Sequence, residues 1–178
     1  MRRACLLLLL CGCASAPSTS TDAVTAPQPV IYQGKNGTIL GDAPNSSSAD
    51  FTESPATVWT AVKKVYADLQ VPVTIDNAAA HQVGNKNFIK SRTLAGQSMT
   101  EFVDCGSGMT GPNASSWRIY ISTITVVQPN NKGGTNVQTV FVPTGEDISG
   151  TSSDRIPCGT TGRFEALFLA KVKAALAQ

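Results

Sequence analysis

The chain has 178 residues, of which 15% are charged and 42% are hydrophobic. This composition supports a packed core and argues against global disorder, and the length leaves room for one domain. Once Arg2 and Arg3 are set aside, the basic residues equal the acidic ones in number. A chain without net positive charge has no positive electrostatic potential to attract a polyanion. The charge balance therefore argues against a nucleic-acid partner.

The N-terminus has the order of an export signal. Arg2 and Arg3 form a basic start, residues 6–10 are all leucine, and small residues follow. The apolar run is too short to span a bilayer, which takes about 20 apolar residues in a helix. We therefore expect residues 1–12 to be a signal peptide that takes no part in the fold.

Two cleavage chemistries fit this leader. Ala14-Ser15-Ala16 can serve an ordinary signal peptidase, which would leave Pro17 at the N-terminus of a plain secreted protein. Proline there fits an extended substrate poorly, because it lacks a backbone N–H and its φ angle is fixed.

The other motif, Leu10-Cys11-Gly12-Cys13, resembles the lipobox of bacterial lipoproteins. The resemblance implies that the Cys13 thiol carries diacylglycerol and anchors the chain to a membrane. Ala14 then implies the outer membrane, facing the periplasm, because it is not the acidic residue that retains some lipoproteins on the inner membrane. We prefer this interpretation, with the plain secreted protein as the first alternative and a buried or transmembrane N-terminal helix as the second.

Residues 13–50 are rich in Ser, Thr, Ala, Pro, Gly and Asn. We expect a lipid-anchored tether, and as a random coil it would span about 30 Å. Only residues 30–32 and 38–40 are apolar enough to pair, and they could form a hairpin or an edge strand on the domain. Both possibilities stay open.

The domain is predicted to span residues 51–178 and to begin with a helix. Ser54 suits the N-cap and Pro55 the first helical position. The apolar residues that follow recur at helical spacing: Val58, Val62, Val65 and Leu69.

The centre of the domain is predicted to be strands and its end a second helix. The expected strands cover residues 71–76, 81–92, 98–105, 117–127 and 135–142, the last two joined as a hairpin. A helix over residues 161–178, capped by Thr161, would bury Phe164, Leu167, Phe168, Ala175 and Leu176. Strands that follow one another predict an α+β fold, with an antiparallel sheet of about five strands and both helices packed on one face.

Cysteine arithmetic predicts one disulfide. The leader holds Cys5 and Cys11, and Cys13 is assigned to the lipid, so Cys105 and Cys158 form an even pair in an oxidising compartment. A metal pair or a catalytic thiol would need further ligands or a base. We expect a Cys105–Cys158 bridge.

The sequence offers few groups for catalysis. His81 is the one histidine, and it is spaced from no partner as a metal site requires, so we expect no metal and no cofactor. An envelope hydrolase is the alternative, with His81 activating a hydroxyl in the loop after Cys105: Ser107, Thr110 or Ser115. A lone histidine at the start of a strand is more often a surface residue.

One strand has a pattern that could serve binding, although we prefer to interpret it as an ordinary solvated face. In residues 81–92 the side chains of Lys86, Phe88, Lys90 and Arg92 have the same parity and would share one strand face. Such a basic, aromatic face could bind an acidic peptide, a glycan or lipid headgroups. The alternative is a solvated face on which long cationic side chains cover Phe88.

Residues 57–87 contain the run TVWTAVKKVYADLQVPVTIDNAAAHQVG, with a Trp in a helix, a strand ending in Asp and a Gly in the next strand. This run resembles the helix-then-hairpin domain of the lipoprotein C component of the outer-membrane β-barrel assembly machine. The resemblance implies a non-catalytic domain that docks on envelope proteins. The chain departs from that family in having one such domain instead of two and in its predicted disulfide.

These observations favour a lipid-anchored, non-enzymatic binding or assembly module of the bacterial envelope with a protein partner. The envelope hydrolase is the first alternative, and a purely structural surface lipoprotein is the second.

Overall fold

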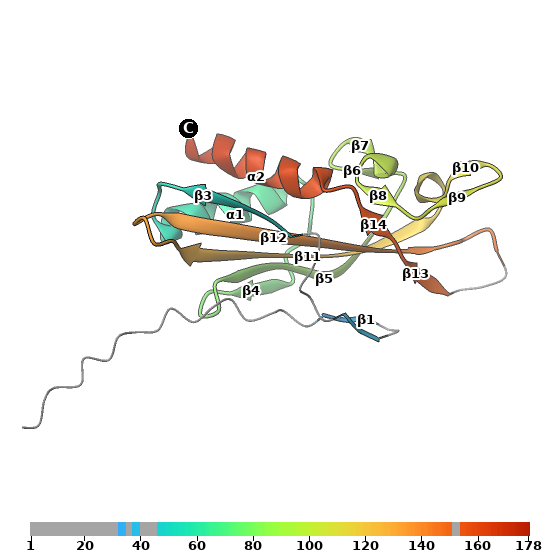
Figure 1. The fold of residues 1–178 in the computed structure, drawn as a ribbon, viewed down its shortest axis with the longest axis horizontal. Helices are drawn as coiled ribbons and strands as arrows, with labels where there is room; N and C mark the ends of the chain where they lie inside the picture. The colour runs from blue at the N-terminus through green and yellow to red at the C-terminus, as the bar shows by residue number, and fades with distance from the viewer. Residues whose placement is uncertain (1–31, 35–36, 40–45, 151–153) are drawn as a thin grey trace, which may run out of the picture.

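The fold is α+β, with an antiparallel sheet and two helices packed together over one of its faces (Figure 1). The structure, a computed structural model, describes residues 32–34, 37–39, 46–150 and 154–178. This architecture confirms the predicted fold class. The predicted signal peptide, Cys13 and most of the predicted tether lie outside the described residues.

The sheet is built on two long central strands. Its order is β13-β12-β11-β5-β4. Two strands share the edge of β12 that faces away from β11: β13 pairs with residues 144–146, and β3 pairs with residues 135–140. The strands are β3 (Ser46–Phe51), β4 (Ile75–Asn77), β5 (Gln82–Ser91), β11 (Arg118–Pro129), β12 (Thr135–Glu146) and β13 (Arg155–Pro157). All pairings are antiparallel.

The β11–β12 hairpin confirms the prediction for this region. Its register runs without interruption from Arg118↔Glu146 to Pro129↔Thr135. Asn130 closes the turn, because its side-chain oxygen accepts the N–H groups of residues 132 and 134. Both helices pack on this hairpin, α1 against β11 and α2 against β12.

Helix α1 (Pro55–Asp68) begins where the sequence indicates. The Ser54 hydroxyl accepts the Thr57 N–H at 3.3 Å, and Pro55 stands at the first helical position, where its missing N–H costs nothing. The predicted apolar positions are all buried: Val58, Val62, Val65 and Leu69.

Helix α2 (Arg163–Leu176) completes the core. Phe164 stacks on Phe141 of β12 with ring centroids 4.4 Å apart, and Phe168 meets Tyr66 of α1 edge to face at 5.0 Å. The helix starts later than predicted, because the N-cap is Gly162, with a φ of 78° that suits glycine, and not Thr161.

Tyr66 and Glu165 are titratable residues buried within this core. The hydroxyl of Tyr66 is 2.9 Å from that of Thr125, and burial raises the tyrosine pKa to about 12. At the start of α2, Glu165 is fully buried and both of its carboxylate oxygens lie 3.2 Å from the Thr160 hydroxyl. Burial raises the pKa of Glu165 above its usual range.

Three segments differ from the predicted elements. Residues 98–105 form no strand of the main sheet but a 3₁₀ turn and a two-residue strand. Met99, Phe102 and Val103 are all buried, and a strand with alternating sides would expose some of them. The predicted strand over residues 71–76 begins only at Ile75. Pro72 has no N–H to donate, and Val73 is 39% exposed.

The third difference is β3, which lies within the predicted tether. Its sequence, SSSADF, is too polar to suggest a strand, yet its backbone pairs with β12 from Phe51↔Thr135 to Ser46↔Val140. An edge strand with exposed polar side chains needs no apolar alternation. The ordered domain therefore includes residues 46–50.

The remaining elements are short. They are β1 (Tyr32–Gly34), β2 (Gly37–Ile39), β6 (Thr93–Leu94), β7 (Gln97–Ser98), η1 (Met99–Glu101), β8 (Val103–Asp104), β9 (Ser107–Gly108), β10 (Gly111–Pro112), η2 (Asn113–Ser115) and β14 (Gly159–Thr160). Strands β1 and β2 pair as a hairpin, which overlaps the predicted segments 30–32 and 38–40 in part.

Candidate docking surface at the disulfide end

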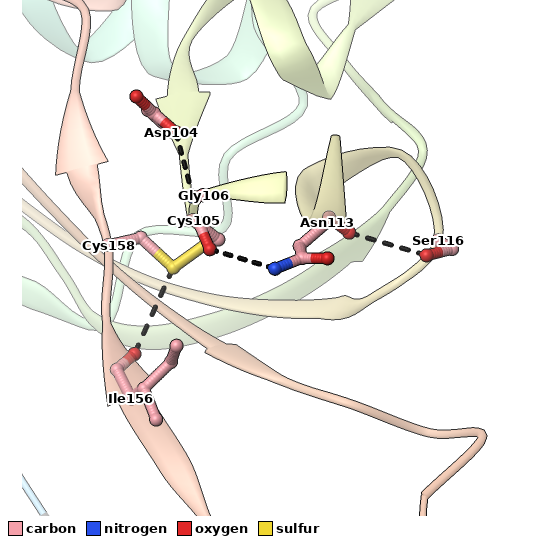
Figure 2. Close-up of a disulfide and its surroundings, with 7 residues drawn as sticks. All are labelled: Asp104, Cys105, Gly106, Asn113, Ser116, Ile156 and Cys158. Atoms are coloured by element: carbon pink, nitrogen blue, oxygen red, sulfur yellow. Dashed lines mark hydrogen bonds between the residues drawn. A yellow bond between two sulfur atoms is a disulfide. The ribbon is translucent and has the colours of Figure 1, made fainter. Parts of the chain in front are cut away.

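One end of the molecule is held together by a disulfide. Strand β8 pairs with β14 through Asp104↔Gly159, which places the neighbouring Cys105 and Cys158 4.4 Å apart between their Cα atoms. Figure 2 shows the predicted Cys105–Cys158 bridge. We call the region formed by the bridge, β9, β10, β13 and residues 147–150 the disulfide end; β9, β10 and β13 lie toward the right of Figure 1.

The bridge is packed directly against strand β12. A Cβ atom at Gly145 would lie 3.0 Å from the sulfur of Cys158, 3.1 Å from that of Cys105 and 2.8 Å from the ring of Trp117. No side chain fits in that space. The glycine therefore allows the disulfide and the indole ring to lie on the strand backbone.

Asn113 fixes the loop that follows Cys105. Its side-chain amide donates to the Cys105 carbonyl at 3.1 Å, and its own N–H donates to the Gly106 carbonyl at 2.9 Å (Figure 2 shows the first contact). Its carbonyl accepts the N–H of Trp117. The carboxylate of Asp104 accepts the N–H of Gly106 at 2.8 Å. Hydrogen bonds, rather than burial, order this loop.

Large apolar side chains stand exposed on this rigid end. The five exposed large hydrophobic residues of the described chain are Val73, Ile89, Met109, Ile148 and Ile156. Met109 is fully exposed at the turn between β9 and β10, and Ile148 and Ile156 are 56% and 41% exposed. Three of the five therefore belong to the disulfide end. Exposed hydrophobic residues that gather into a patch mark protein-binding surfaces, and these three lie in segments at the same end of the molecule.

The charges beside these residues are paired with one another. The Tyr120 hydroxyl donates to the Glu146 carboxylate, the Arg155 guanidinium lies 3.4 Å from the centroid of the Tyr120 ring, and Arg118 is 3.7 Å from Glu146. The pKa of Arg118 is raised, mainly by its contact with Tyr120 and to a smaller extent by the charge of Glu146. In the adjacent loop the Ser149 hydroxyl and N–H donate to Asp147, which lowers the pKa of that carboxyl.

The prediction that Lys86, Phe88, Lys90 and Arg92 share one face of the strand is wrong. The pairing of β5 with β11 shifts register between Ile121 and Thr123, so β5 bulges at Lys86 and Asn87. The bulge reverses the alternation, and Phe88 then points into the core, where only 6% of it is exposed. Lys86 stays exposed and does not share the side of Phe88.

The other two residues of that prediction lie further along. Lys90 is half-buried and follows the alternation of Phe88, whereas Arg92 is exposed at the end of the strand with a φ of 66°. The cations therefore remain near one another along β5, but no exposed aromatic ring lies between them.

The hydrolase pair is also not formed. His81 is exposed in the turn before β5, and its carbonyl accepts the N–H of Val127 near one end of β11. The loop carrying Ser107, Thr110 and Ser115 joins β11 at its other end. A strand of this length spans about 30 Å, so His81 cannot exchange a proton with any of these hydroxyls.

The described residues hold no group of three or more His, Cys, Asp or Glu arranged to bind a metal. Within the same residues no helix is long and apolar enough to cross a membrane. Cys13, the predicted lipidation site, lies outside the described part of the chain.

The exposed apolar residues were not predicted from the sequence, although the residues around Met109 indicate that its side chain is exposed. It lies in GSGMTGP, between glycines and hydroxyl residues that offer no apolar neighbours to bury it. Ile148 and Ile156 lie in the long polar segment before Cys158 and carry a weaker signal of the same kind.

No protein-family model matches the chain, and no curated protein matches it. Its function must therefore be inferred from its own residues.

Proposed function

We propose that this protein is a lipid-anchored, non-enzymatic docking module of the bacterial envelope, facing the periplasm from the outer membrane, and that it binds an envelope protein through its disulfide end. The observation that carries the proposal is the exposure of Met109, Ile148 and Ile156 at the end of the molecule that holds the Cys105–Cys158 bridge. The leader, the lipobox-like Leu10-Cys11-Gly12-Cys13 and the even cysteine pair support the compartment.

Rigidity is what makes these exposed side chains suitable for binding. Association costs free energy when loops and side chains become ordered, and a surface that is already ordered avoids most of that cost. Asn113 and the bridge hold both sides of the loop that presents Met109. Methionine also adapts its shape to a partner, because it is unbranched and polarisable.

The two alternatives make different demands on the molecule. A hydrolase using His81 would need that side chain beside a hydroxyl, and the fold places the candidate hydroxyls at the opposite end of β11. A purely structural lipoprotein needs no contact at Met109. A crosslinking experiment separates this second alternative from docking.

The experiment places a photo-crosslinking amino acid at Met109 of the full-length chain, expressed in its own envelope. The matched control has the same amino acid at His81, which is also solvent-exposed but lies at the other end of the sheet. We expect discrete protein adducts from position 109 and none from position 81. Adducts of equal pattern at both positions, or none at position 109, would contradict docking through the disulfide end.

The anchor is tested separately. Intact-mass analysis should find an acylated N-terminal Cys13, and a Cys13→Ala variant should keep its leader and lose the acyl mass. A mature chain that begins at Pro17 would instead establish the plain secreted protein, and the docking proposal would then have to stand without a membrane anchor.

A further inference from the structure

Strand β5 has one edge that the sheet leaves uncovered. On its inner side β5 pairs with β11 along most of its length, from Gln82↔Val126 to Ser91↔Arg118. On its outer side β4 covers only residues 82–84, and the Thr74 hydroxyl accepts the Lys86 N–H just beyond. In the part of the chain that the structure describes, residues 88–91 have no partner on that side; we call them the free edge.

The free edge presents backbone hydrogen-bonding groups. In an antiparallel strand alternate residues direct their N–H and C=O groups to each side, so part of this set points away from β11. Ile89 is 53% exposed on the edge, and Ser91 is exposed as well. An edge of this kind is a template for an added strand.

The bulge holds the free edge in place. Asn85, which is 1% exposed, accepts the Asn87 N–H at 2.8 Å and donates to the Pro72 carbonyl at 2.5 Å. The same side chain therefore shapes β5 and fixes the segment that enters β4. Residues 88–91 begin directly after this anchored point and need no reordering to accept a strand.

The charge along the free edge selects the partner. Lys86 precedes it, Lys90 lies within it and Arg92 follows it. The ion pairs of the described residues involve none of these three cations. A second copy of the chain pairing here would bring like charges together, which disfavours self-association. An acidic strand would meet opposite charges instead.

We propose that the free edge of β5 binds an acidic peptide segment in extended conformation as an additional strand of the sheet. The inference rests on the proposed function, since the segment belongs to the envelope protein that docks on this module. Backbone hydrogen bonds give the affinity, and Lys86, Lys90 and Arg92 give the preference for acidic side chains.

The test uses the purified full-length protein and a short, blocked, fluorescent peptide in which Glu and Val alternate. A peptide in which Lys and Val alternate is the charge control. We expect saturable binding of the Glu–Val peptide below about 1 mM, at least about tenfold weaker binding of the Lys–Val peptide, and slowed amide hydrogen exchange at residues 88–91 when the Glu–Val peptide is present.

Charge-reversal variants locate the site. Lys86→Glu combined with Lys90→Glu should weaken Glu–Val binding at least about tenfold. Lys171→Glu combined with Lys173→Glu changes the net charge equally on α2 and should leave binding unchanged, while near-ultraviolet circular dichroism verifies the fold of both variants. Equal loss in both variants, no saturable binding by the wild type, or protection outside residues 88–91 would overturn the proposal.

The outcome is separable from that of the docking proposal. If position 109 crosslinks an envelope protein while the peptide does not bind, the docking module stands and the added strand falls. If the peptide binds and position 109 forms no adduct, the free edge is a binding site and the disulfide end is not.

Discussion

The helix-covered part of the sheet and the disulfide end are ordered by different interactions. Under the helices, Tyr66, Phe141, Phe164 and Phe168 meet ring to ring and are almost entirely inaccessible to solvent. At the disulfide end, the chain is ordered by a covalent bridge and by the hydrogen bonds of Asn113.

This difference explains where hydrophobic residues can be left exposed. A region whose order depends on burying apolar side chains cannot present them to a partner without losing stability. A region ordered by a covalent bond and backbone contacts can present them, and Met109 is the clearest case. The buried aromatic cluster and three of the five exposed large hydrophobic residues of the described chain therefore lie in different parts of the molecule.

The largest expected effect is in the helix-covered part. Phe164→Ala removes a ring that contacts three other aromatic rings, and we expect the free energy of unfolding to fall by about 3–5 kcal/mol. Ala166→Ser, exposed on the same helix, should change it by less than about 0.5 kcal/mol. Urea unfolding measures both, and a loss below about 1 kcal/mol for Phe164→Ala would show that the ring cluster is not the main support.

The next effect concerns the bridge. Replacing Cys105 and Cys158 by alanine opens a loop with a sequence separation of 53 residues, and the chain-entropy relation gives a loss of up to about 4 kcal/mol. The lower free energy of unfolding should accelerate exchange of the α1 amides that open only when the whole domain unfolds, and amides near Asn113 should accelerate further because they also open locally. Equal acceleration in both places would mean that the bridge gives the loop near Asn113 no local order of its own.

Gly145→Ala should cost about 1–3 kcal/mol, because its Cβ would press on Trp117 and on both sulfur atoms. The cost should shrink in the variant without the disulfide, since two of the three contacts are then removed. A double-mutant cycle by urea unfolding measures this coupling, and strictly additive losses would show that the strand backbone moves away instead.

The smallest effect lies where the two regions meet, at Glu165. Its pKa is raised by burial, so the folded protein binds the proton more tightly than the unfolded chain, and stability falls as pH rises above the usual glutamate pKa. Glu165→Gln removes this dependence. The melting temperature of the variant relative to wild type should rise from about pH 4 to about pH 7, and a constant difference would contradict a raised pKa.

The sequence was sufficient for the parts of the fold that follow a simple period. Helix α1, the β11–β12 hairpin and the α+β class were all predicted, because their apolar residues recur at the spacing of a helix or a strand. The disulfide followed from cysteine arithmetic. These features depend on local pattern or on chemistry that allows few alternatives.

The features that were not predicted from the sequence depend on contacts between segments far apart in the chain. The bulge in β5 arises from one buried amide, Asn85, and it changes the side on which Phe88 lies. The nearby glycine was a usable signal, since Gly84 lies so close to β11 that a Cβ would approach the Thr123 carbonyl to 2.2 Å. Strand β3 gave no signal, because its place is set by the open edge of β12.

Strand β3 also has a kinetic consequence. It joins Ser46 to Val140 across most of the domain, whereas β11 and β12 are neighbours in sequence and need only a short turn. Closing the longer loop costs more entropy before any contact repays it. We expect the hairpin to form early and β3 to join the sheet among the last elements, after the rest of the domain has folded.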